Sequence, residues 1–498
     1  MPNANEDNLS ALSQVQRRAV SELLRVSPVA DDLARRFQEA GFSLALVGGS
    51  VRDALLGRLG NDLDFTTDAR PEDVLKIVRP WADAVWEVGI AFGTVGCQKD
   101  ARIEDPDRPG GPAVEQRFQI EITTYRSEAY DRTSRKPEVS YGDSIEEDLV
   151  RRDFTVNAMA VSLPEKEFID PHGGLRDLAE RVLRTPGTPE DSFSDDPLRM
   201  MRAARFAAQL DFEVAPDVVA AMNAMAERID IVSAERVRDE LTKLILSAHP
   251  RKGLTLLVDT GLAERMLPEL PALRLERDEH HRHKDVYEHS LIVLEQAMAL
   301  ETDGPDLTLR IAALLHDIGK PRTRRFESDG RVSFHHHEVV GAKMTKKRLT
   351  ALKYPNDLVK DVSRLVELHL RFHGYGTGEW TDSAVRRYVR DAGPLLDRLH
   401  KLTRSDCTTR NKRKATALSR AYDGLEERIS QLQEQEELDA IRPDLNGNEI
   451  MEVLGVGPGP VIGEAYSFLL ELRLENGPME RDAAEAALKE WWAKESKG

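Results

Sequence analysis

Three carboxylates near the start of the chain have the type and spacing that metal-assisted phosphoryl transfer requires. Asp62 and Asp64 are two residues apart in NDLDFTT, and in a strand such residues project from the same face. Glu121, in the alternating segment QIEITTYR, is the candidate third carboxylate, because a neighbouring strand can bring it to that face. These residues predict a Mg2+ site, where one ion activates an attacking hydroxyl and another neutralises a triphosphate.

A glycine turn stands directly before the Asp pair. The apolar run SLALV ends at Gly48 and Gly49, where a bare backbone can approach phosphate oxygens, and a helix presenting Arg52 follows. An isolated Asp-x-Asp is common in solvated turns. Glycines, an arginine and carboxylates together, on a strand–turn–helix–strand frame, favour a phosphate-facing catalytic site.

Several segments resemble one enzyme family in the same order. VGGSVRDALLGRLGNDLDF resembles the signature of the polymerase-beta-like nucleotidyltransferases, in the class II group of tRNA CCA-adding enzymes and bacterial poly(A) polymerases. RRDFTVNAMA (151–160) resembles the family's ribose-reading motif, DPHGGLRDL (170–178) its hinge motif and DDPLRMMRAARF (195–206) its nucleotide-base motif. SAERVRDELTKL (233–244) also has a counterpart in the family, so the resemblance covers residues 41–250.

The ribose-reading motif contains donors and acceptors suited to a 2′-hydroxyl. Asp153 and Asn157 offer a carboxylate and an amide, as needed to choose NTPs over dNTPs. The resemblance implies that Arg152 also contacts the nucleotide. A simpler interpretation, in which Asp153 only caps a helix, remains compatible with this role.

The nucleotide-base motif reads as a helix with a polar residue at every third position: Asp196, Arg199, Arg202 and Arg205. A carboxylate beside a guanidinium fork can meet the Watson–Crick edges of both C and A. The resemblance implies that Asp196 and Arg199 read the base, while Arg202 and Arg205 support the nucleotide and its phosphates. The alternative is a solvated Asp–Arg ladder, which contributes little. The family usually has Glu-Asp where this chain has Asp-Asp at 195–196.

Two further segments favour complete CCA addition over poly(A) synthesis or partial CC or A addition, which share the same motifs. VGIAFGTVG (88–96) resembles the CCA-adding form. YDRTSRKPEVSYGDSIEEDL (130–149) resembles the flexible loop used in switching from CTP to ATP, although a surface loop without that role remains an alternative. The expected partners are therefore the tRNA 3′ end, CTP and ATP.

A second group of residues has the chemistry of a metal centre. Eleven of the 13 histidines fall between residues 280 and 400, and ALLHDIGK puts an adjacent His–Asp pair at the end of an apolar helix. Neutral imidazoles with carboxylates suit a divalent transition metal. The candidate ligands are His289, His316, Asp317, His337, His369 and Asp406, with His335 and His336 as alternatives to His337.

This second pattern is similar to the HD phosphohydrolase superfamily over residues 280–410. The similarity implies phosphodiesterase or phosphatase activity on 2′,3′-cyclic or terminal phosphates. A module that only scaffolds RNA is the alternative. Two other functions are considered for the whole chain: an HD hydrolase whose head only binds, and a noncatalytic RNA chaperone.

Composition limits the other functions. The net charge of −17 requires any RNA site to be a local basic patch, for which KPRTRR (320–325), KMTKKRL (343–349) and RNKRK (410–414) are candidates, although a solvated helix face explains each of them as well. Cys97 and Cys407 have no CxxC spacing and read as ordinary thiols. No apolar stretch is long enough to span a membrane and no signal peptide is recognised, so we expect a cytoplasmic protein without a membrane partner.

These elements predict an α+β multidomain chain. A polymerase-beta-like mixed α/β head is followed by a helical neck and body, an α-helical HD domain and a helical tail that binds tRNA. The expected boundaries are a helical extension at 1–30, the head at 31–165, the neck and body at 166–270, the HD domain at 271–410 and the tail at 411–498.

Overall fold

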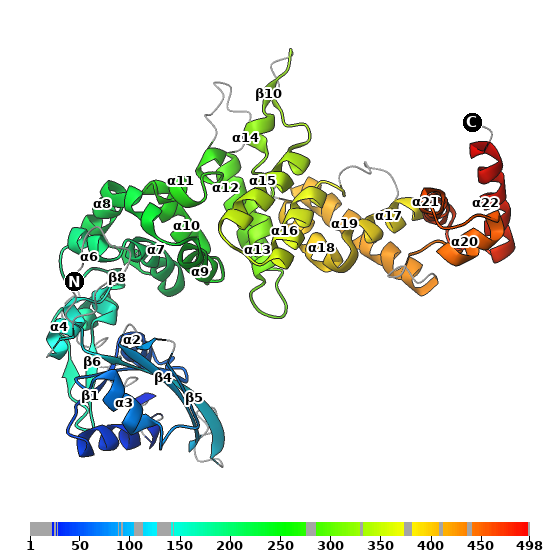
Figure 1. Cartoon of the computed structure of the whole chain (residues 1–498). Coiled ribbons are helices and arrows are strands. Elements are labelled where there is room, and N and C mark those ends of the chain that lie inside the picture. The colour runs from blue at the N-terminus through cyan, green and yellow to red at the C-terminus, as the bar shows by residue number, and fades with distance from the viewer. Residues whose placement is uncertain are drawn as a thin grey trace. The chain divides into compact units, whose positions relative to one another are not determined.

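The computed structural model describes most of the chain (Figure 1). The described residues are 22–23, 26, 28–87, 89–90, 93–103, 113–126, 141–142, 144–274, 285–328, 332–372, 381–407, 412–435 and 441–496. The chain divides into two compact units, Met1–Met266 and Leu267–Gly498. The predicted extension at 1–30 lies almost entirely outside the described residues, and the finer predicted boundaries stay predictions.

A seven-stranded sheet forms the core of the first part of unit 1. Its strands are β1 (Leu44–Val47), β2 (Asp62–Thr67), β3 (Ala84–Trp86), β4 (Thr94–Ile103), β5 (Val114–Thr124), β6 (Ala160–Leu163) and β7 (Phe168–Ile169). Their order is β3-β4-β5-β2-β1-β6-β7. Only the central pair of β2 and β5 is parallel, and the other pairs are antiparallel.

The register of β2 and β5 separates an apolar face from a polar face. Leu63 pairs with Ile120 and Phe65 with Ile122, and all four side chains are buried. Because side chains alternate along a strand, the residues between them point the other way. The polar face at this point therefore carries the carboxylates of β2 and β5.

Short helices lie between and after the strands of unit 1. They are α2 (Gly49–Leu55), α3 (Pro71–Val78), α4 (Ile145–Val150) and the 3-10 turn η2 (Thr155–Asn157). The helical part follows with α5 (Gly174–Glu180), α6 (Pro189–Asp195), α7 (Leu198–Leu210), α8 (Pro216–Met225), η3 (Ala226–Ile231), α9 (Ala234–Ile245), α10 (Pro250–Asp259) and α11 (Leu262–Met266), and the short strands β8 (Val182–Leu183) and β9 (Glu213–Val214) pair there. Helix α7 is central, because it packs against both α9 and α10. The predicted mixed head and helical body are confirmed.

Unit 2 is almost entirely helical. After η4 (Pro271–Leu273) it contains α12 (Val286–Met298), α13 (Leu307–Leu315), α14 (Lys320–Thr323), the β10–β11 hairpin (Arg325–Phe326 with Val332–Ser333), α15 (His337–Ala351), α16 (Asn356–Leu368), α17 (Asp382–Ala392), η6 (Gly393–Leu395) and α18 (Leu396–Ser405). Then follow α19 (Lys412–Gln435), α20 (Gly447–Leu454), α21 (Pro460–Asn476) and α22 (Arg481–Glu495). Helices α12, α13, α16 and α18 pack together, and α20, α21 and α22 share a small core that includes Leu445, Ile450 and Leu488.

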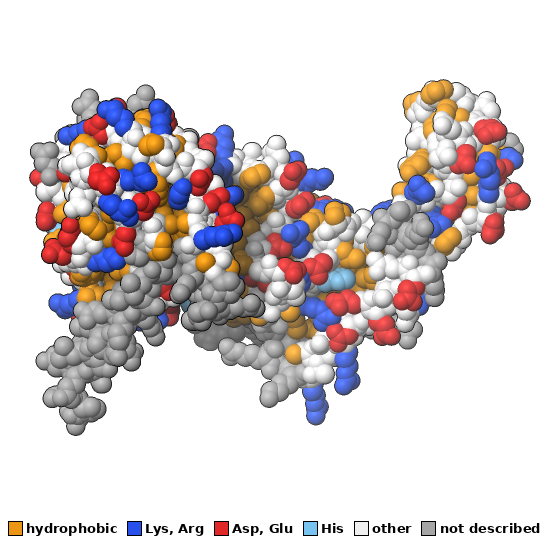
Figure 2. Space-filling view, turned by 90° about the horizontal axis from the view of Figure 1, so that it is seen from below, with side chains coloured by type: hydrophobic (Ala, Val, Ile, Leu, Met, Phe, Trp, Pro, Cys, Tyr) orange, Lys and Arg blue, Asp and Glu red, His pale blue; other side chains and the backbone are white. Residues whose placement is uncertain are grey.

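The charged surface and the two cysteines are as the sequence indicates. Figure 2 shows acidic and basic side chains interspersed over the face that it draws. Cys97 is buried, which raises the pKa of its thiol to about 12, and Cys407 is partly exposed; both are free thiols. Among the described helices, none combines the length and apolar character needed to cross a bilayer.

Candidate functional site

The three predicted carboxylates lie together on the polar face of the sheet. Asp64 is the register partner of Glu121 across the parallel β2–β5 pair, and Asp62 lies two residues before Asp64 on the same face. Ser50, at the start of α2, accepts a hydrogen bond from the Asp64 main-chain N–H at 2.8 Å and donates to the Asp62 main-chain oxygen at 3.4 Å. The glycine turn is thereby fixed to the strand that carries both aspartates.

The electrostatics of this cluster fit a divalent cation. The surrounding protein desolvates the Asp64 carboxyl and, with the negative charge of Glu121, raises its pKa to about 6. The positive charges of Arg152 and Arg52 oppose this rise in pKa but do not cancel it. Asp64 is still exposed on the side that faces solvent, where a metal ion could reach it. Adjacent carboxylates with too little neighbouring positive charge suit a hard metal ion with oxygen ligands.

Gly48 and the arginines form the wall of the site next to α2. Gly48 has φ of 68°, and a Cβ at this position would lie 2.6 Å from Nη1 of Arg152. Arg152 is held by the buried Asp148, whose carboxylate accepts its hydrogen bond at 3.0 Å. Arg52 is buried and donates to Asn157 Oδ1 at 2.6 Å. Only glycine at position 48 therefore allows the guanidinium of Arg152 to approach the turn.

Asp153 is the centre of a buried hydrogen-bond network. It accepts from Asn157 Nδ2 at 2.9 Å, from its neighbour's main-chain N–H at 2.8 Å and from Arg202 Nε at 2.7 Å. Burial by itself raises the pKa of the Asp153 carboxyl, but the charge of Arg202 and the Asn157 hydrogen bond outweigh it and lower the pKa below its usual range. The network joins the ribose-reading motif to α7.

The structure corrects the predicted helix position of Asp196. Asp196 has an extended backbone and precedes α7, which begins at Leu198 because the segment turns at Pro197. Its carboxylate accepts hydrogen bonds from Arg236 at 2.7 Å and from the main-chain N–H of Leu198 at 3.1 Å. Arg199 does not pair with it in a ladder, since its guanidinium donates to the Arg151 main-chain oxygen at 2.6 Å and to Ser192 Oγ at 2.9 Å.

Arg205 is buried. The sequence predicts that it either supports the phosphates of the nucleotide or lies on a solvated helix face, and neither expectation indicates burial. Its Nε donates to Glu240 Oε2 at 2.5 Å, and Arg202 lies 3.8 Å from the same carboxylate. The guanidiniums of Arg52, Arg202 and Arg205 all lie within 5.5 Å of the centroid of the Phe206 ring. Arg205 therefore braces α7 against α9 from inside the helical core.

The six predicted ligands of the second site converge in unit 2. They form two groups of three whose donor atoms lie within 4.8 Å of one another: His289, His316 and Asp406, and Asp317, His337 and His369. Asp317 faces both groups, with Oδ2 3.2 Å from His316 Nε2 and Oδ1 3.2 Å from His337 Nε2. The alternatives His335 and His336 are exposed, so the geometry favours His337. We refer to these six residues as the histidine cluster.

Main-chain carbonyls set the orientation of three of its imidazoles. His316, His337 and His369 each face the main-chain oxygen three residues earlier with Nδ1, at 2.8, 2.8 and 2.6 Å. In the neutral imidazole, donation from Nδ1 leaves Nε2 unprotonated and pointing into the cluster. Nε2 of His337 and of His369 is buried and has no hydrogen-bond donor among the described residues, because Oδ1 of Asp317, 3.2 and 3.9 Å away, is itself an acceptor. These orphaned acceptor nitrogens fit metal coordination.

Charge within the histidine cluster is strongly coupled. Burial lowers the pKa of His316, but Asp317 and Asp406 outweigh it and raise that pKa to about 10. Burial, followed by repulsion from His316, lowers the pKa of His369 to about 3. Burial acts to raise the pKa of both carboxyls, yet their histidine partners hold the pKa of each well below its usual range. The cluster therefore demands positive charge, which a metal ion would supply.

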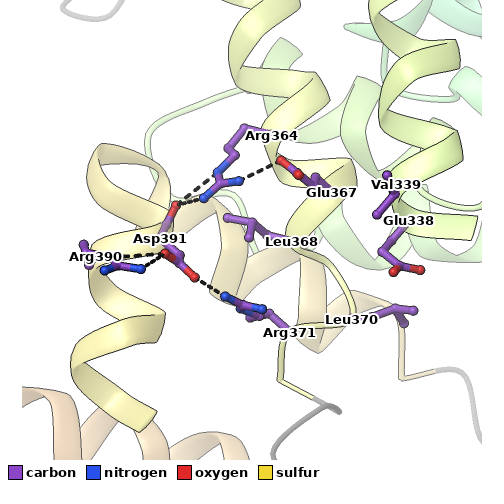
Figure 3. A pocket seen from close by; sticks show the side chains of 9 residues that line it. All are labelled: Glu338, Val339, Arg364, Glu367, Leu368, Leu370, Arg371, Arg390 and Asp391. Carbon is purple, nitrogen blue, oxygen red and sulfur yellow. Dashed lines mark hydrogen bonds and ion pairs between the residues drawn. The ribbon is translucent and has the colours of Figure 1, made fainter. Parts of the chain in front are cut away.

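A pocket of about 530 Å³ lies where α15 begins and α16 ends, next to α17 (Figure 3). Asp391 is central to its wall: it receives the guanidiniums of Arg371 and Arg390 on its carboxylate and that of Arg364 on its main-chain oxygen. Burial acts to raise the pKa of the Asp391 carboxyl, but the two arginines lower it overall. These charges compensate one another and hold α17 against the end of α16.

Parts of two predicted segments lie outside the described residues. Most of the loop at 130–149 does so, because only 141–142 and 144–149 are described. In the segment at 88–96, residues 88, 91 and 92 are also outside, while Thr94 Oγ1 lies 2.9 Å from Thr123 Oγ1. The sequence-based arguments for CTP-to-ATP switching therefore stay predictions.

Four residues at the first site were not anticipated: Ser50, Asp148, Arg236 and Glu240. Two of them had a local signal in the sequence. Asp148 lies four residues before Arg152, the spacing of a helical ion pair, and Glu240 occupies the apolar stripe of α9 with Val237 and Leu241. A carboxylate at such a position indicates a buried ion pair. Ser50 and Arg236 act through hydrogen bonds to residues 14 and 40 positions away, which no local pattern encodes.

Family models cover most of both units. The poly A polymerase head domain matches residues 44–184. The model described as the probable RNA and SrmB-binding site of polymerase A matches residues 211–273, and the HD domain matches residues 286–411. These matches include the three carboxylates and the histidine cluster, whereas Asp196, Arg199, Arg202 and Arg205 lie between the first two matches.

Whole-chain relatives and a solved structure agree with these models. An A-adding tRNA nucleotidyltransferase of Deinococcus radiodurans is 35% identical over 91% of this chain and 96% of its own. A CCA-adding enzyme of Streptococcus suis is 30% identical over 90% of this chain and 93% of its own. The Bacillus stearothermophilus CCA-adding enzyme, solved in complex with CTP, is 25% identical with a TM-score of 0.65, over 96% of this chain and 99% of that one.

Proposed function

The chain belongs to the family of tRNA nucleotidyltransferases that contains the CCA-adding and A-adding enzymes, and we propose that it adds C, C and A from CTP and ATP to the 3′ end of tRNA. The observation that carries the proposal is the alignment of Asp64 with Glu121 across the parallel β2–β5 pair, beside Asp62 and the Gly48 turn. A tRNA substrate also implies work in the cytoplasm. A binding-only head would not require all three carboxylates on one face.

Each group at this site has a distinct task in the proposal. Asp62, Asp64 and Glu121 would hold Mg2+, which would activate the terminal hydroxyl of tRNA and neutralise the triphosphate. Gly48 and Gly49 admit the phosphates to the backbone, and Arg52 and Arg152 supply positive charge beside them. Ser50 keeps the turn and β2 in register, so that the reactants meet a fixed frame.

Sugar and base are selected on the other side of the site. Asp153 and Asn157, held rigid by Arg202 and Arg52, would bind the ribose hydroxyls. Asp196 and Arg199 would read the base. Asp196 already accepts a hydrogen bond from Arg236, and Arg199 already donates to the main-chain oxygen of Arg151. A bound C or A would have to replace these hydrogen bonds with others of similar strength. A base with the wrong pattern of donors and acceptors would not restore the lost hydrogen bonds and would bind more weakly.

The first experiment separates complete from partial addition. Purified protein is incubated with tRNA ending before CCA, before CA or before A, with CTP alone, ATP alone or both, and the 3′ ends are sequenced. We expect CC with CTP alone and CCA with both nucleotides. Extension only of tRNA ending in CC, and only by A, would establish A addition, the second candidate that the Deinococcus relative favours. Long A tails would overturn both.

A matched pair of variants tests the carboxylates. Asp64→Asn changes one ligand in the site, whereas Asp73→Asn changes a partly exposed aspartate of α3 in the same domain. We expect the first to lower incorporation at least about a thousandfold and the second to leave it unchanged. Retained incorporation after Asp62→Ala combined with Asp64→Ala would refute the metal assignment.

For the histidine cluster we propose a second, hydrolytic site with a divalent transition metal. The support is the pair of orphaned Nε2 atoms and the position of Asp317 between two groups of ligands. Its substrates would be 2′,3′-cyclic or terminal phosphates of RNA. Hydrolysis of a 2′,3′-cyclic mononucleotide with added Ni2+ or Mn2+ should disappear in His316→Ala. Undiminished hydrolysis in that variant would exclude this cluster as its site.

A further inference from the structure

A basic surface lies on α14, the β10–β11 hairpin and α15. Residues 320–348 carry eight described lysines and arginines against two described acidic residues, Glu327 and Glu338, in a chain with net charge −17. We define the basic surface by the six cations Arg322, Arg324, Arg325, Lys343, Lys346 and Lys347. The charge density here is opposite in sign to that of the chain as a whole.

None of these six cations forms an ion pair with a described residue that would explain its presence in the fold. Lys320 pairs with Asp317 at 2.6 Å and Arg348 with Glu269 at 2.8 Å, but no ion pair with a described residue reaches the other six. Five of them are exposed, and only Arg324 is partly buried. Lys343, Lys346 and Lys347 recur at helical spacing, so they share one side of α15. Unneutralised like charges at such density indicate an anionic partner.

An exposed aromatic residue lies within the same surface. Phe326 is 70% exposed on the hairpin that projects from the helices around α14 (Figure 1). The Arg324 guanidinium lies 4.8 Å from the centroid of its ring. A ring that contributes so little to any core is available for stacking, and arginine beside it strengthens binding to a nucleobase. Cations with an aromatic platform fit single-stranded nucleic acid better than a lipid surface, which would need a larger apolar patch.

The basic surface is joined directly to the histidine cluster. Helix α14 begins three residues after Asp317, and α15 begins with His337. Gly319 packs so closely on the main chain of His337 that a side chain at that position would collide with it. The basic surface therefore begins at Arg322, five residues from Asp317, and continues over α15, where Lys343, Lys346 and Lys347 lie six to ten residues beyond His337 on a different side of the helix.

We propose that the basic surface binds single-stranded RNA and delivers its phosphate-bearing 3′ end to the histidine cluster. The delivery part rests on the hydrolytic function proposed above, whereas the binding part does not. The lysines and arginines would hold the phosphodiester backbone, and Phe326 would stack on a base. Arg322 and Arg325, on either side of Arg324, would flank that base.

Photo-crosslinking tests the surface directly, whatever other parts of the chain bind RNA. Phe326→p-benzoylphenylalanine in the full chain should capture a 10-nucleotide RNA, and unlabelled RNA should compete. The same substitution at Phe168, which is 43% exposed on β7 at the edge of the sheet of unit 1, provides the matched control. Equal capture at both positions, or capture at neither, would overturn the proposal. So would binding to vesicles of anionic lipid in place of RNA.

Affinity measurements test the charges. Lys347→Glu should reduce the slope of log affinity against log salt by about 0.7 for each phosphate that the surface no longer neutralises, and Phe326→Ala should weaken binding about tenfold. Lys360→Glu makes the same charge change at an exposed lysine of α16 and should alter affinity less than twofold. Equal effects of Lys347→Glu and Lys360→Glu would mean that only the net charge matters, and would refute a specific surface.

Hydrolysis assays separate two hypotheses: that the basic surface delivers RNA, and that the histidine cluster hydrolyses phosphates. With Ni2+ or Mn2+ added, Lys347→Glu should raise KM for an RNA ending in a 2′,3′-cyclic phosphate about tenfold. It should leave kcat for a cyclic mononucleotide unchanged, because the metal ligands are intact. If neither substrate is hydrolysed by the unmodified chain, the hydrolytic function fails, and crosslinking still decides whether the surface binds RNA. Equal KM values for the RNA would refute delivery.

Discussion

The Glu240–Arg205 ion pair should be essential to the helical part of unit 1. Both side chains are at most 8% exposed, and Arg205 Nε lies 2.5 Å from Glu240 Oε2. Glu240→Ala would leave the guanidinium of Arg205 buried without its counterion, and breaking a buried pair in this way costs about 3–5 kcal/mol. Glu240→Gln keeps an acceptor but removes the charge, so we expect a smaller loss of about 2 kcal/mol.

Hydrogen exchange followed by mass spectrometry is the suitable assay, because two units unfold in this chain and a single unfolding transition would not be interpretable. In the regime where exchange reports the opening equilibrium, Glu240→Ala should speed exchange in peptides from α7 and α9 about 100- to 4,000-fold, the equivalent of about 3–5 kcal/mol. Peptides from α12 and α13 should not change. The exposed Arg265–Asp230 pair supplies the control, and Asp230→Ala should cost less than about 1 kcal/mol.

A double replacement separates the charge from the packing. Arg205→Met with Glu240→Leu removes both charges and fills the space with apolar atoms, which for buried ion pairs is often neutral or stabilising. We expect protection of α7 and α9 to return to within about tenfold of the unmodified chain. The reasoning is refuted if the double variant is less protected than Glu240→Ala, or if Glu240→Ala changes exchange less than tenfold.

Three further outcomes follow from the two sites. Gly48→Ala should speed hydrogen exchange in peptides from β1 and α2 about 5- to 30-fold, since a side chain on a residue with positive φ costs about 1–2 kcal/mol, whereas Gly49→Ala, whose Cβ would make only ordinary contacts, should not. Elemental analysis after loading with Ni2+ and desalting should find at least one more ion per chain in the unmodified chain than in Asp317→Ala. Arg236→Ala should raise misincorporation of GTP and UTP about tenfold, because Asp196 loses the charged hydrogen bond that orients it; unchanged fidelity would contradict that role.

Local periodicity accounts for what could be predicted at the first site. The two-residue repeat of a strand placed Asp62 and Asp64 on one face, and the need for a third ligand directed attention to Glu121 on an alternating strand. The register then made Asp64 and Glu121 direct neighbours. Asp196 was misplaced for a related reason: its three-residue spacing from Arg199 suggested a helix, but Pro197 lies between them and α7 starts only after it.

Long-range partners account for what could not be predicted. Arg236 lies 40 residues from Asp196 in sequence, and Glu240 lies 35 residues from Arg205. Neither distance corresponds to a helical or strand repeat, so the pairing depends on how α7 and α9 pack. The sequence could indicate that Glu240 is buried, from its place in an apolar stripe, but not which cation it meets.

Helix ends explain how the residues of the histidine cluster come to face one another. His316, His369 and Asp406 are the residues that follow the last turns of α13, α16 and α18. At such positions an imidazole Nδ1 can donate to one of the last helical carbonyls, which have no intrahelical partner, and this leaves Nε2 for a metal. Three helix C-termini also bring partial negative charge toward the carboxylates of Asp317 and Asp406. The same local rule therefore sets the tautomer of two ligands and the electrostatic preference of the cluster for a cation.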